Sequence, residues 1–305
     1  MRREMVRKRP AGTAASSPRT RSRLSEFGVP EHPEEIRRSL SSLGVRPSKG
    51  WGQSFLSDPF IADAEAALVE VPTGRPVVEI GGGLGILTAA LLRRGVGPLT
   101  VVERDPRLAG FLRSTFGDRI RVLVGDALSV ELPPAECIVG NLPYSVATPI
   151  LVRVLERRTP RVVFLIQREV AERLAAAPGS KQYGRLSLLA RLYGTVELYR
   201  TVSASAFVPE PEVESRIGVH VARPGGLPVS SIADFERVVR TLFSSRRKQL
   251  GNLLPHLTGR SGDPQRLAME AGWPSDWSTR RPEQLPPEAF FAMTRCLATR
   301  WGQGE

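Results

Sequence analysis

The sequence has few of the residues that bind metals or form redox centres. Its 305 residues include three scattered histidines and two cysteines, Cys137 and Cys296, which lie in no CxxC motif or Cys/His cluster. This argues against a zinc site and against a His-based catalytic triad, so we expect no metal. Cys137 lies within an apolar run and is expected to be a small buried residue.

Long hydrophobic segments are also missing. No apolar run approaches the length of a membrane span, and no secretory h-region is present, so we expect a soluble protein in a reducing, cytoplasmic compartment. Residues 1–25 hold eight Lys/Arg and one acidic residue among Pro, Gly, Ser and Thr. This composition predicts a disordered basic tail. An organelle presequence is the alternative, although the prolines disfavour an amphipathic helix.

Acidic residues are outnumbered, and the net charge is +12 with a pI near 10.8. This balance indicates a polyanionic partner, nucleic acid before membrane, unless the charge is only a solvated basic surface. The length allows a full α/β core together with a second, smaller domain.

Strand and helix patterns alternate from residue 77 onward. Continuous β-branched runs between helices predict a parallel sheet covered on both faces. The expected strands are Val77–Ile80, Leu99–Glu103, Ile120–Val124, Cys137–Gly140 and Val162–Ile166, with an antiparallel hairpin from Val196–Val202 and Ile217–Val221. The expected helices are Pro33–Leu43, Asp58–Val71, Leu84–Arg94 and Pro106–Phe116, with others starting near Thr148 and Arg168. In the second of these, Phe60 and Ile61 fall on the predicted buried face.

A Pro/Gly-rich linker at Pro224–Pro228 separates a helical segment from this pattern. We predict a basic, disordered extension at 1–45, a nucleotide-binding domain at 46–223 and a helical domain at 224–305. The helices expected in the last domain are Ile232–Phe243, Arg247–Leu254, Pro264–Ala271 and Pro287–Arg300.

A glycine-rich turn, Glu79-x-Gly81-x-Gly83-x-Gly85, follows the first of these sheet strands. Glycine lets a ligand approach the backbone there, as in NAD, FAD or S-adenosylmethionine sites. Glu103 ends the next strand, where its carboxylate can accept both hydroxyls of a ribose. Asp126 ends the third, where it can hydrogen-bond an adenine amino group. The combination favours S-adenosylmethionine, unless both acids are merely polar residues at strand ends.

The tetrapeptide Asn141-Leu142-Pro143-Tyr144 follows the fourth apolar run. The side-chain oxygen of Asn141 and the carbonyl of Leu142 can accept both hydrogens of an exocyclic amino group, while Pro143 stiffens the loop. Tyr144 can stack on the base that carries this group, or it can be a capping aromatic. The motif therefore indicates methyl transfer to a nucleobase amino group.

These motifs give the chain a resemblance to a known family. From residue 46 to about 300 it is similar to the ribosomal RNA adenine N6,N6-dimethyltransferases, which modify a hairpin near the 3′ end of small-subunit RNA. Six strings occur in the family's order: Gly52-Gln53-Ser54-Phe55-Leu56, the glycine turn, Asn141–Tyr144, Ser180–Ser187, Phe207–Ser215 and Arg246-Arg247-Lys248.

The resemblance implies a Rossmann-like class I methyltransferase sheet with a small all-helical C-terminal domain, and S-adenosylmethionine as cofactor. The cofactor contacts it implies are Gln53, Ser54, Leu56, Gly81, Gly83, Glu103, Asp126, Ala127 and Asn141. Phe207 would pack on the other face of the target base from Tyr144; a core aromatic is the alternative. The sequence departs from the family at Ser54, where Asn is usual, and at Gly82, where Pro is usual.

Basic residues in two segments are candidates for RNA binding. Arg246, Arg247 and Lys248, expected at a helix start, resemble a phosphate clamp, although a charged triplet is often only a solvated helix face. Lys181, Tyr183 and Arg185 lie in a Gly/Ser-bounded loop suited to contact beside a flipped base. The implied partner is small-subunit ribosomal RNA in an assembling particle of the pre-30S type, and we expect the protein to act as a monomer.

Three other functions remain open at this point. The related large-subunit dimethyltransferases that confer macrolide resistance share much of the pattern. A non-catalytic RNA- or DNA-binding relative is a second possibility, and the presence of Asn141, Tyr144, Glu103 and Asp126 argues against it. A DNA amino-methyltransferase would share the Asn-x-Pro-Tyr chemistry without the other strings.

Overall fold

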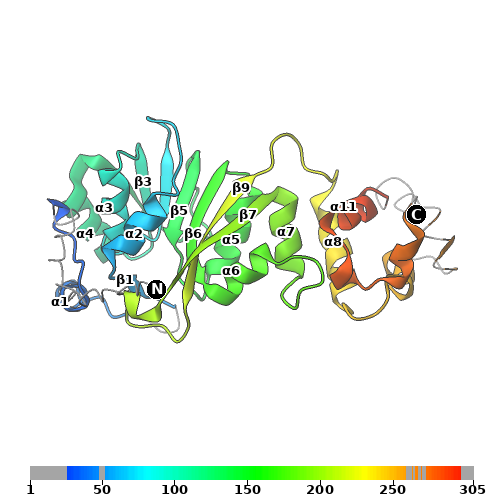
Figure 1. Cartoon of the computed structure of the whole chain (residues 1–305). Coiled ribbons are helices and arrows are strands. Elements are labelled where there is room, and N and C mark those ends of the chain that lie inside the picture. Colours follow the sequence, from blue (N-terminus) through cyan, green and yellow to red (C-terminus); the bar gives the residue numbers. More distant parts are fainter. Residues whose placement is uncertain are drawn as a thin grey trace, which may run out of the picture.

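A mixed seven-stranded sheet is the centre of the molecule (Figure 1). The computed structural model describes residues 26–47, 52–258, 263, 265–266, 269 and 273–296. Within these residues the strand order is β4-β3-β2-β5-β6-β9-β7. The strands are β2 (Val77–Ile80), β3 (Leu99–Glu103), β4 (Ile120–Val124), β5 (Cys137–Asn141), β6 (Arg161–Gln167), β7 (Gly194–Val202) and β9 (Ser215–Ala222). β4, β3, β2, β5 and β6 pair in parallel, which confirms the α/β class predicted from the sequence.

The last two strands of this sheet are antiparallel to their neighbours. β7 and β9 pair as the expected hairpin, and β9 lies between β7 and β6. A separate two-stranded ladder joins β1 (Phe55–Leu56) to β8 (Phe207–Val208). The fold thus brings the segment around residue 55 against the segment around residue 207.

Helices cover both faces of the sheet (Figure 1). They are α1 (Pro33–Ser42), α2 (Pro59–Ala66), α3 (Ile86–Arg93), α4 (Pro106–Phe116), α5 (Ala147–Glu156), α6 (Arg168–Ala175) and α7 (Arg185–Tyr193). Val77 and Val139 belong to the hydrophobic cluster with α2, α3 and α4, whereas Val78 and Ile138 belong to the cluster with α5, α6 and α7. Successive strand residues point to opposite faces, so a sheet covered on both sides has strands that are apolar throughout.

The C-terminal helices lie beyond α7, at one end of the molecule (Figure 1). They are α8 (Ile232–Phe243), α9 (Leu254–Thr258) and α11 (Pro287–Cys296), together with the short 3₁₀ helices Leu250–Asn252, Ser275–Thr279 and Pro282–Gln284. Two further 3₁₀ helices, Gly117–Arg119 and Ala204–Ala206, lie earlier in the chain. The hydrophobic cluster of α5, α6 and α7 continues into this region through α8 and α11. The Phe243 and Phe290 rings, for example, stack with centroids 5.8 Å apart. The division at residue 224 stays a prediction.

Several local predictions need correction. Phe60, placed on the buried face of its helix, is 68% exposed because α2 packs mainly through Ile61, Ala62 and Ala66. The same helix ends at Ala66 rather than Val71. The helix expected from Arg247 is wrong, since α8 ends at Phe243 and a turn follows. The helix expected over 264–271 and the basic tail at 1–25 fall on or largely on residues outside those described. Among the described helices, none has the length and apolar character needed to span a bilayer.

Candidate active site

The glycine turn after β2 has little room for side chains. Gly83 has φ 56°, and a Cβ there would lie 3.3 Å from the Phe55 ring. Gly85 has φ 83° at the start of α3, and a Cβ there would lie 2.6 Å from Phe116. The left-handed backbone at both positions favours glycine, and the turn is held close to neighbouring side chains.

At Gly82, where the family usually has proline, neighbouring side chains occupy the space that a Cβ would need. A Cβ at this position would lie 2.4 Å from Cγ1 of Val101 and 2.8 Å from Cδ1 of Leu112. The space that a larger residue would need is therefore occupied by side chains from β3 and α4. The departure from the family pattern is matched by the packing around it.

Two acidic residues lie beside the turn, at the ends of neighbouring strands. One carboxylate oxygen of Glu103 accepts a hydrogen bond from the Gly83 N–H and the other from the Asp105 N–H, each at 2.9 Å. Glu103 is buried; burial raises the pKa of its carboxyl group, and the backbone donors oppose that rise. Asp126 accepts from the Leu128 N–H at 2.9 Å, and its second oxygen lies 3.6 Å from the Arg104 guanidinium.

Glu79, at the start of the turn, is completely buried. One of its carboxylate oxygens accepts a hydrogen bond from the Thr88 hydroxyl at 2.7 Å, and the other has no partner among the described residues. Burial raises the pKa of Glu79 to about 8, the hydroxyl of Thr88 opposes this rise, and the neighbouring Glu103 carboxylate adds to it. The glycines of the turn were evident from the sequence, whereas the burial that raises the pKa of Glu79 was not.

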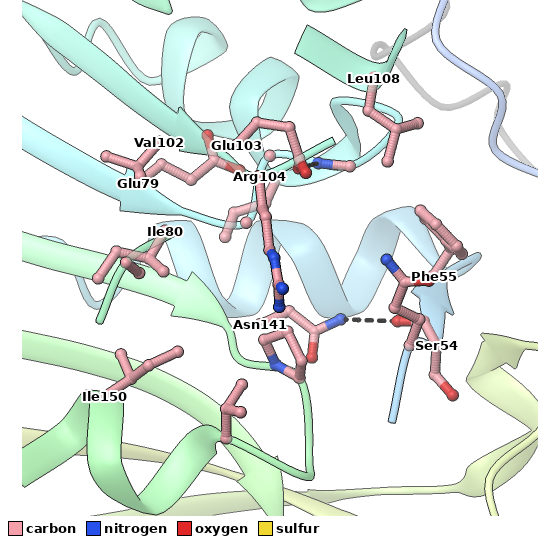
Figure 2. A pocket seen from close by; sticks show the side chains of 18 of the residues that line it. Ser54, Phe55, Glu79, Ile80, Val102, Glu103, Arg104, Leu108, Asn141 and Ile150 are labelled. Carbon is pink, nitrogen blue, oxygen red and sulfur yellow. Dashed lines mark hydrogen bonds between the residues drawn. The ribbon is translucent and has the colours of Figure 1, made fainter. Parts of the chain in front are cut away.

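A pocket opens between the glycine turn, the two strand-end acids and Asn141 (Figure 2). All nine residues expected to contact a cofactor line it: Gln53, Ser54, Leu56, Gly81, Gly83, Glu103, Asp126, Ala127 and Asn141. The side-chain amide of Asn141 donates to the Ser54 carbonyl at 3.5 Å. The Ser54 hydroxyl donates to the Pro209 carbonyl at 3.0 Å, so this serine also fixes the loop after β8.

Arg104 and Ile150 line the same pocket and were not predicted from the sequence. The Arg104 side chain extends from the Glu103 side of the pocket toward Asn141 (Figure 2). Its position directly after the acid that ends β3 is a signal that could have identified it. Ile150 lies on α5, where the sequence shows only an apolar helix position.

The Asn141–Tyr144 loop is anchored at several points. The Leu142 N–H donates to the Leu165 carbonyl at 3.1 Å, and the Tyr144 N–H donates to the Gly52 carbonyl at 3.3 Å. The Tyr144 hydroxyl lies 2.6 Å from the Ser215 hydroxyl. Pro143 also lines the pocket. Ser215 belongs to one of the recognised strings, but its sequence context indicated no role for it.

Phe207 does not take the position expected of a base-stacking ring. It is 2% exposed, whereas Tyr144 is half-buried, and the two rings meet edge-on with centroids 6.5 Å apart. Neither ring lines the cofactor pocket. The pairing of β8 with β1 and the packing of the surrounding hydrophobic cluster cover it. In this structure Phe207 is the core aromatic that the alternative interpretation described.

The candidate RNA-binding residues divide into exposed and buried ones. Tyr183 was wrongly placed on the surface: it is 1% exposed, donates to the Leu285 carbonyl at 3.0 Å and packs against Phe243. Arg246 pairs with Glu283 at 2.7 Å and donates to the Lys181 carbonyl at 3.2 Å, so it joins two loops. The other four side chains are exposed: Lys181, Arg185, Arg247 and Lys248. The triplet lies in a turn after α8, not at a helix start.

The described residues contain no cluster of His, Cys, Asp and Glu that could hold a metal ion. Cys137 is buried as expected, and burial raises the pKa of its thiol to about 12.

Comparisons with known proteins agree with this geometry. The sequence model of a family described as ribosomal RNA adenine dimethylase matches residues 46–267. The ribosomal RNA small subunit methyltransferase A of Anaeromyxobacter dehalogenans (strain 2CP-C) is 38% identical over 278 residues, which cover 86% of this chain and 97% of that one. A probable ribosomal RNA small subunit methyltransferase A of Natronomonas pharaonis is 40% identical over 267 residues, covering 85% and 96%.

Two solved structures have similar folds. A dimethyladenosine transferase from Plasmodium falciparum matches with a TM-score of 0.70 and 22% identity, over 78% of this chain and 95% of that chain. The 23S rRNA methyltransferase ErmE matches with a TM-score of 0.61 and 27% identity, over 79% and 99%.

Proposed function

The chain belongs to the ribosomal RNA adenine dimethylase family, and from this premise we propose that it dimethylates the N6 of adenines in small-subunit ribosomal RNA. The methyl donor in this proposal is S-adenosylmethionine, and the target adenines lie in a hairpin near the 3′ end of the RNA. The observation that carries the proposal is the pocket in which the glycine turn and the strand-end acids meet Asn141. The curated relatives named for the small subunit support this substrate over the large subunit.

The residues of the pocket fit this cofactor. The glycine turn lines the pocket, and because Gly81 and Gly83 carry no side chains a ligand can come close to its backbone. Each Glu103 oxygen accepts one backbone hydrogen bond and keeps capacity for a ribose hydroxyl. Asp126 follows the next strand and lines the same pocket, where its carboxylate could accept a hydrogen bond from the adenine amino group of the cofactor. Bound S-adenosylmethionine supplies an activated methyl group on a positively charged sulfur.

The Asn141–Tyr144 loop orients the target nitrogen. The lone pair of an adenine amino group is delocalised into the ring, which makes the nitrogen a poor nucleophile. Hydrogen bonds from this nitrogen to the Asn141 oxygen and the Leu142 carbonyl favour a pyramidal geometry. They also stabilise the positive charge that develops as the methyl group arrives. The nitrogen becomes acidic at that stage, so its proton can pass to solvent water without a strong base. Tyr144 stacks on the extruded base.

The exposed basic side chains of Lys181, Arg185, Arg247 and Lys248 bind the phosphate backbone of the RNA in this proposal. Arg246 ties the loop of Lys181 to Glu283 and so fixes the position of that loop relative to the turn of Arg247 and Lys248. Phosphate contacts of this kind position an RNA without reading its sequence. In this division residues 46–223 carry out methyl transfer and residues 224–305 contribute to RNA recognition. We further propose that the enzyme acts as a monomer, and a ribosomal RNA substrate favours a cytoplasmic location.

The test is transfer of labelled methyl from S-adenosylmethionine to purified, unmethylated small and large subunits, followed by nuclease digestion. We expect dimethyladenosine in the small subunit. Asn141→Ala should lower the rate by at least about a hundredfold, because it removes a preorganised acceptor, while the circular dichroism spectrum is unchanged. Incorporation into the large subunit alone would transfer the assignment to the macrolide-resistance class. Binding of subunits without incorporation would indicate a non-catalytic relative.

A further inference from the structure

Tyr144 is held by its hydroxyl group as well as by its backbone. The two backbone hydrogen bonds of the loop, from Leu142 and Tyr144, determine the course of the chain but leave the tyrosine side chain free to rotate. The 2.6 Å contact between the hydroxyls of Tyr144 and Ser215 removes that freedom. The edge of the Phe207 ring packs against the same tyrosine, at an interplanar angle of 70°.

Ser215 is a rigid anchor for this contact. It is completely buried and begins β9, where it pairs with Gln167 of β6 on one side and with Val202 of β7 on the other. The Arg168 N–H, one residue beyond this pair, donates to the Glu214 carbonyl at 2.9 Å and extends the ladder. Pairing on both sides fixes the backbone of Ser215, and complete burial restricts the rotamers that its hydroxyl can adopt.

The location of Ser215 relates it to the reaction site. Asn141 pairs with Leu165 of β6, and Gln167, two residues further along β6, pairs with Ser215. Both Asn141 and Ser215 therefore lie at the same edge of the sheet. Tyr144, three residues after Asn141, is half-buried and is hydrogen-bonded to the buried serine through its hydroxyl.

We propose that Ser215 is a positioning residue that sets the orientation of the Tyr144 ring for stacking on the target adenine. This inference rests on the proposed function. Ser215 does not line the cofactor pocket, so it acts through Tyr144 and not through the cofactor. A stack is sensitive to the tilt of its ring, and a tyrosine free to rotate would present the adenine nitrogen to the methyl group in a wider range of geometries.

The test compares Ser215→Ala, Tyr144→Phe and the double variant in methyl transfer to small subunits. Each single variant removes the same hydrogen bond, so each should lower kcat by about threefold to tenfold. The double variant should be no slower than the slower single variant, because the bond can be lost only once. The cofactor dissociation constant and the KM for subunits should stay within about twofold of the wild-type values.

Ser187→Ala is the matched control. Ser187 is also completely buried and donates a 2.6 Å hydrogen bond to the Arg173 carbonyl, but its hydroxyl bonds only within the α6–α7 segment, where it also accepts from the Gly184 N–H, and it does not line the pocket. Its replacement should lower the unfolding temperature and leave kcat unchanged. An equal loss of kcat in Ser187→Ala and Ser215→Ala would mean that general destabilisation explains both.

A second measurement is independent of activity. In protein labelled with ¹³C at tyrosine Cζ, the Tyr144 resonance is the one missing from Tyr144→Phe. Ser215→Ala should shift this resonance and leave those of the other tyrosines in place. If the wild-type protein fails to methylate small subunits, the proposed function is wrong, and this shift still reports the Tyr144–Ser215 contact. An unshifted resonance, full activity of Ser215→Ala, or losses that multiply in the double variant would each overturn the positioning role.

Discussion

Replacing Glu79 by glutamine should change how the stability of the protein depends on pH. Glu79 is completely buried, and the burial of its carboxyl group raises its pKa from 4.5 to about 8. The folded protein therefore keeps this proton up to about pH 8, whereas the unfolded chain releases it near 4.5. Between these two values the unfolded state binds fewer protons, so the free energy of unfolding falls as the pH rises.

The size of the effect follows from the same pKa values. A group protonated in the folded state and ionised in the unfolded state changes the free energy of unfolding by about 1.4 kcal/mol per pH unit. From about pH 5.5 to about pH 7.5 the free energy of unfolding of the wild-type protein should thus fall by roughly 3 kcal/mol because of Glu79. Glutamine does not ionise, and its carbonyl can still accept the hydrogen bond from Thr88. The free energy of unfolding of Glu79→Gln, relative to that of the wild type, should therefore rise by roughly 3 kcal/mol across this interval.

Urea unfolding followed by circular dichroism, without cofactor and at several pH values, measures this difference. Glu65 and Glu103, whose pKa values are also raised by burial, are present in both proteins, and because both interact electrostatically with Glu79 the difference between the two curves reports the loss of Glu79 together with this coupling. Glu131→Gln, at an exposed carboxylate, is the control and should follow the wild-type curve at every pH. Curves for Glu79→Gln and the wild type that stay parallel from pH 5.5 to 7.5 would refute a protonated Glu79.

Three further predictions concern the cofactor, the RNA and the glycine turn. Glu103→Gln should weaken S-adenosylmethionine binding by roughly tenfold or more in calorimetry, since a charged acceptor is lost; an unchanged dissociation constant would exclude the ribose role. Reversing Arg247 and Lys248 to Glu should weaken RNA binding and reduce the slope of log affinity against log salt by roughly 1 to 2. An unaltered slope would leave both residues as solvated surface charges. Gly82→Ala should destabilise the fold by about 1–3 kcal/mol, because its Cβ would lie 2.4 Å from Cγ1 of Val101. An unchanged urea midpoint would show instead that the Val101 and Leu112 side chains move to accommodate the added Cβ at no cost in stability.

The arrangement of the pocket could be predicted from sequence because it depends on local features. The glycine turn, Glu103, Asp126 and Asn141 each follow an apolar strand, and the ends of parallel strands meet at one edge of a sheet. Strand boundaries were predicted well for the same reason, since a strand buried on both faces is a continuous apolar run. Helix boundaries and exposure were less predictable, as the 68% exposure of Phe60 shows.

The sequence by itself determined most of the residues that meet at the pocket, and only the tertiary structure decided which of the candidate RNA-binding side chains are exposed. Tyr183 lies in a polar loop, yet its hydroxyl is bonded to a carbonyl 102 residues away. Arg246 belongs to a basic triplet but pairs with Glu283, and Tyr144 finds its partner in Ser215, 71 residues along the chain. Burial and pairing of this kind depend on contacts between distant segments. A local pattern records the type of a side chain, but not which distant group will cover it or bind it.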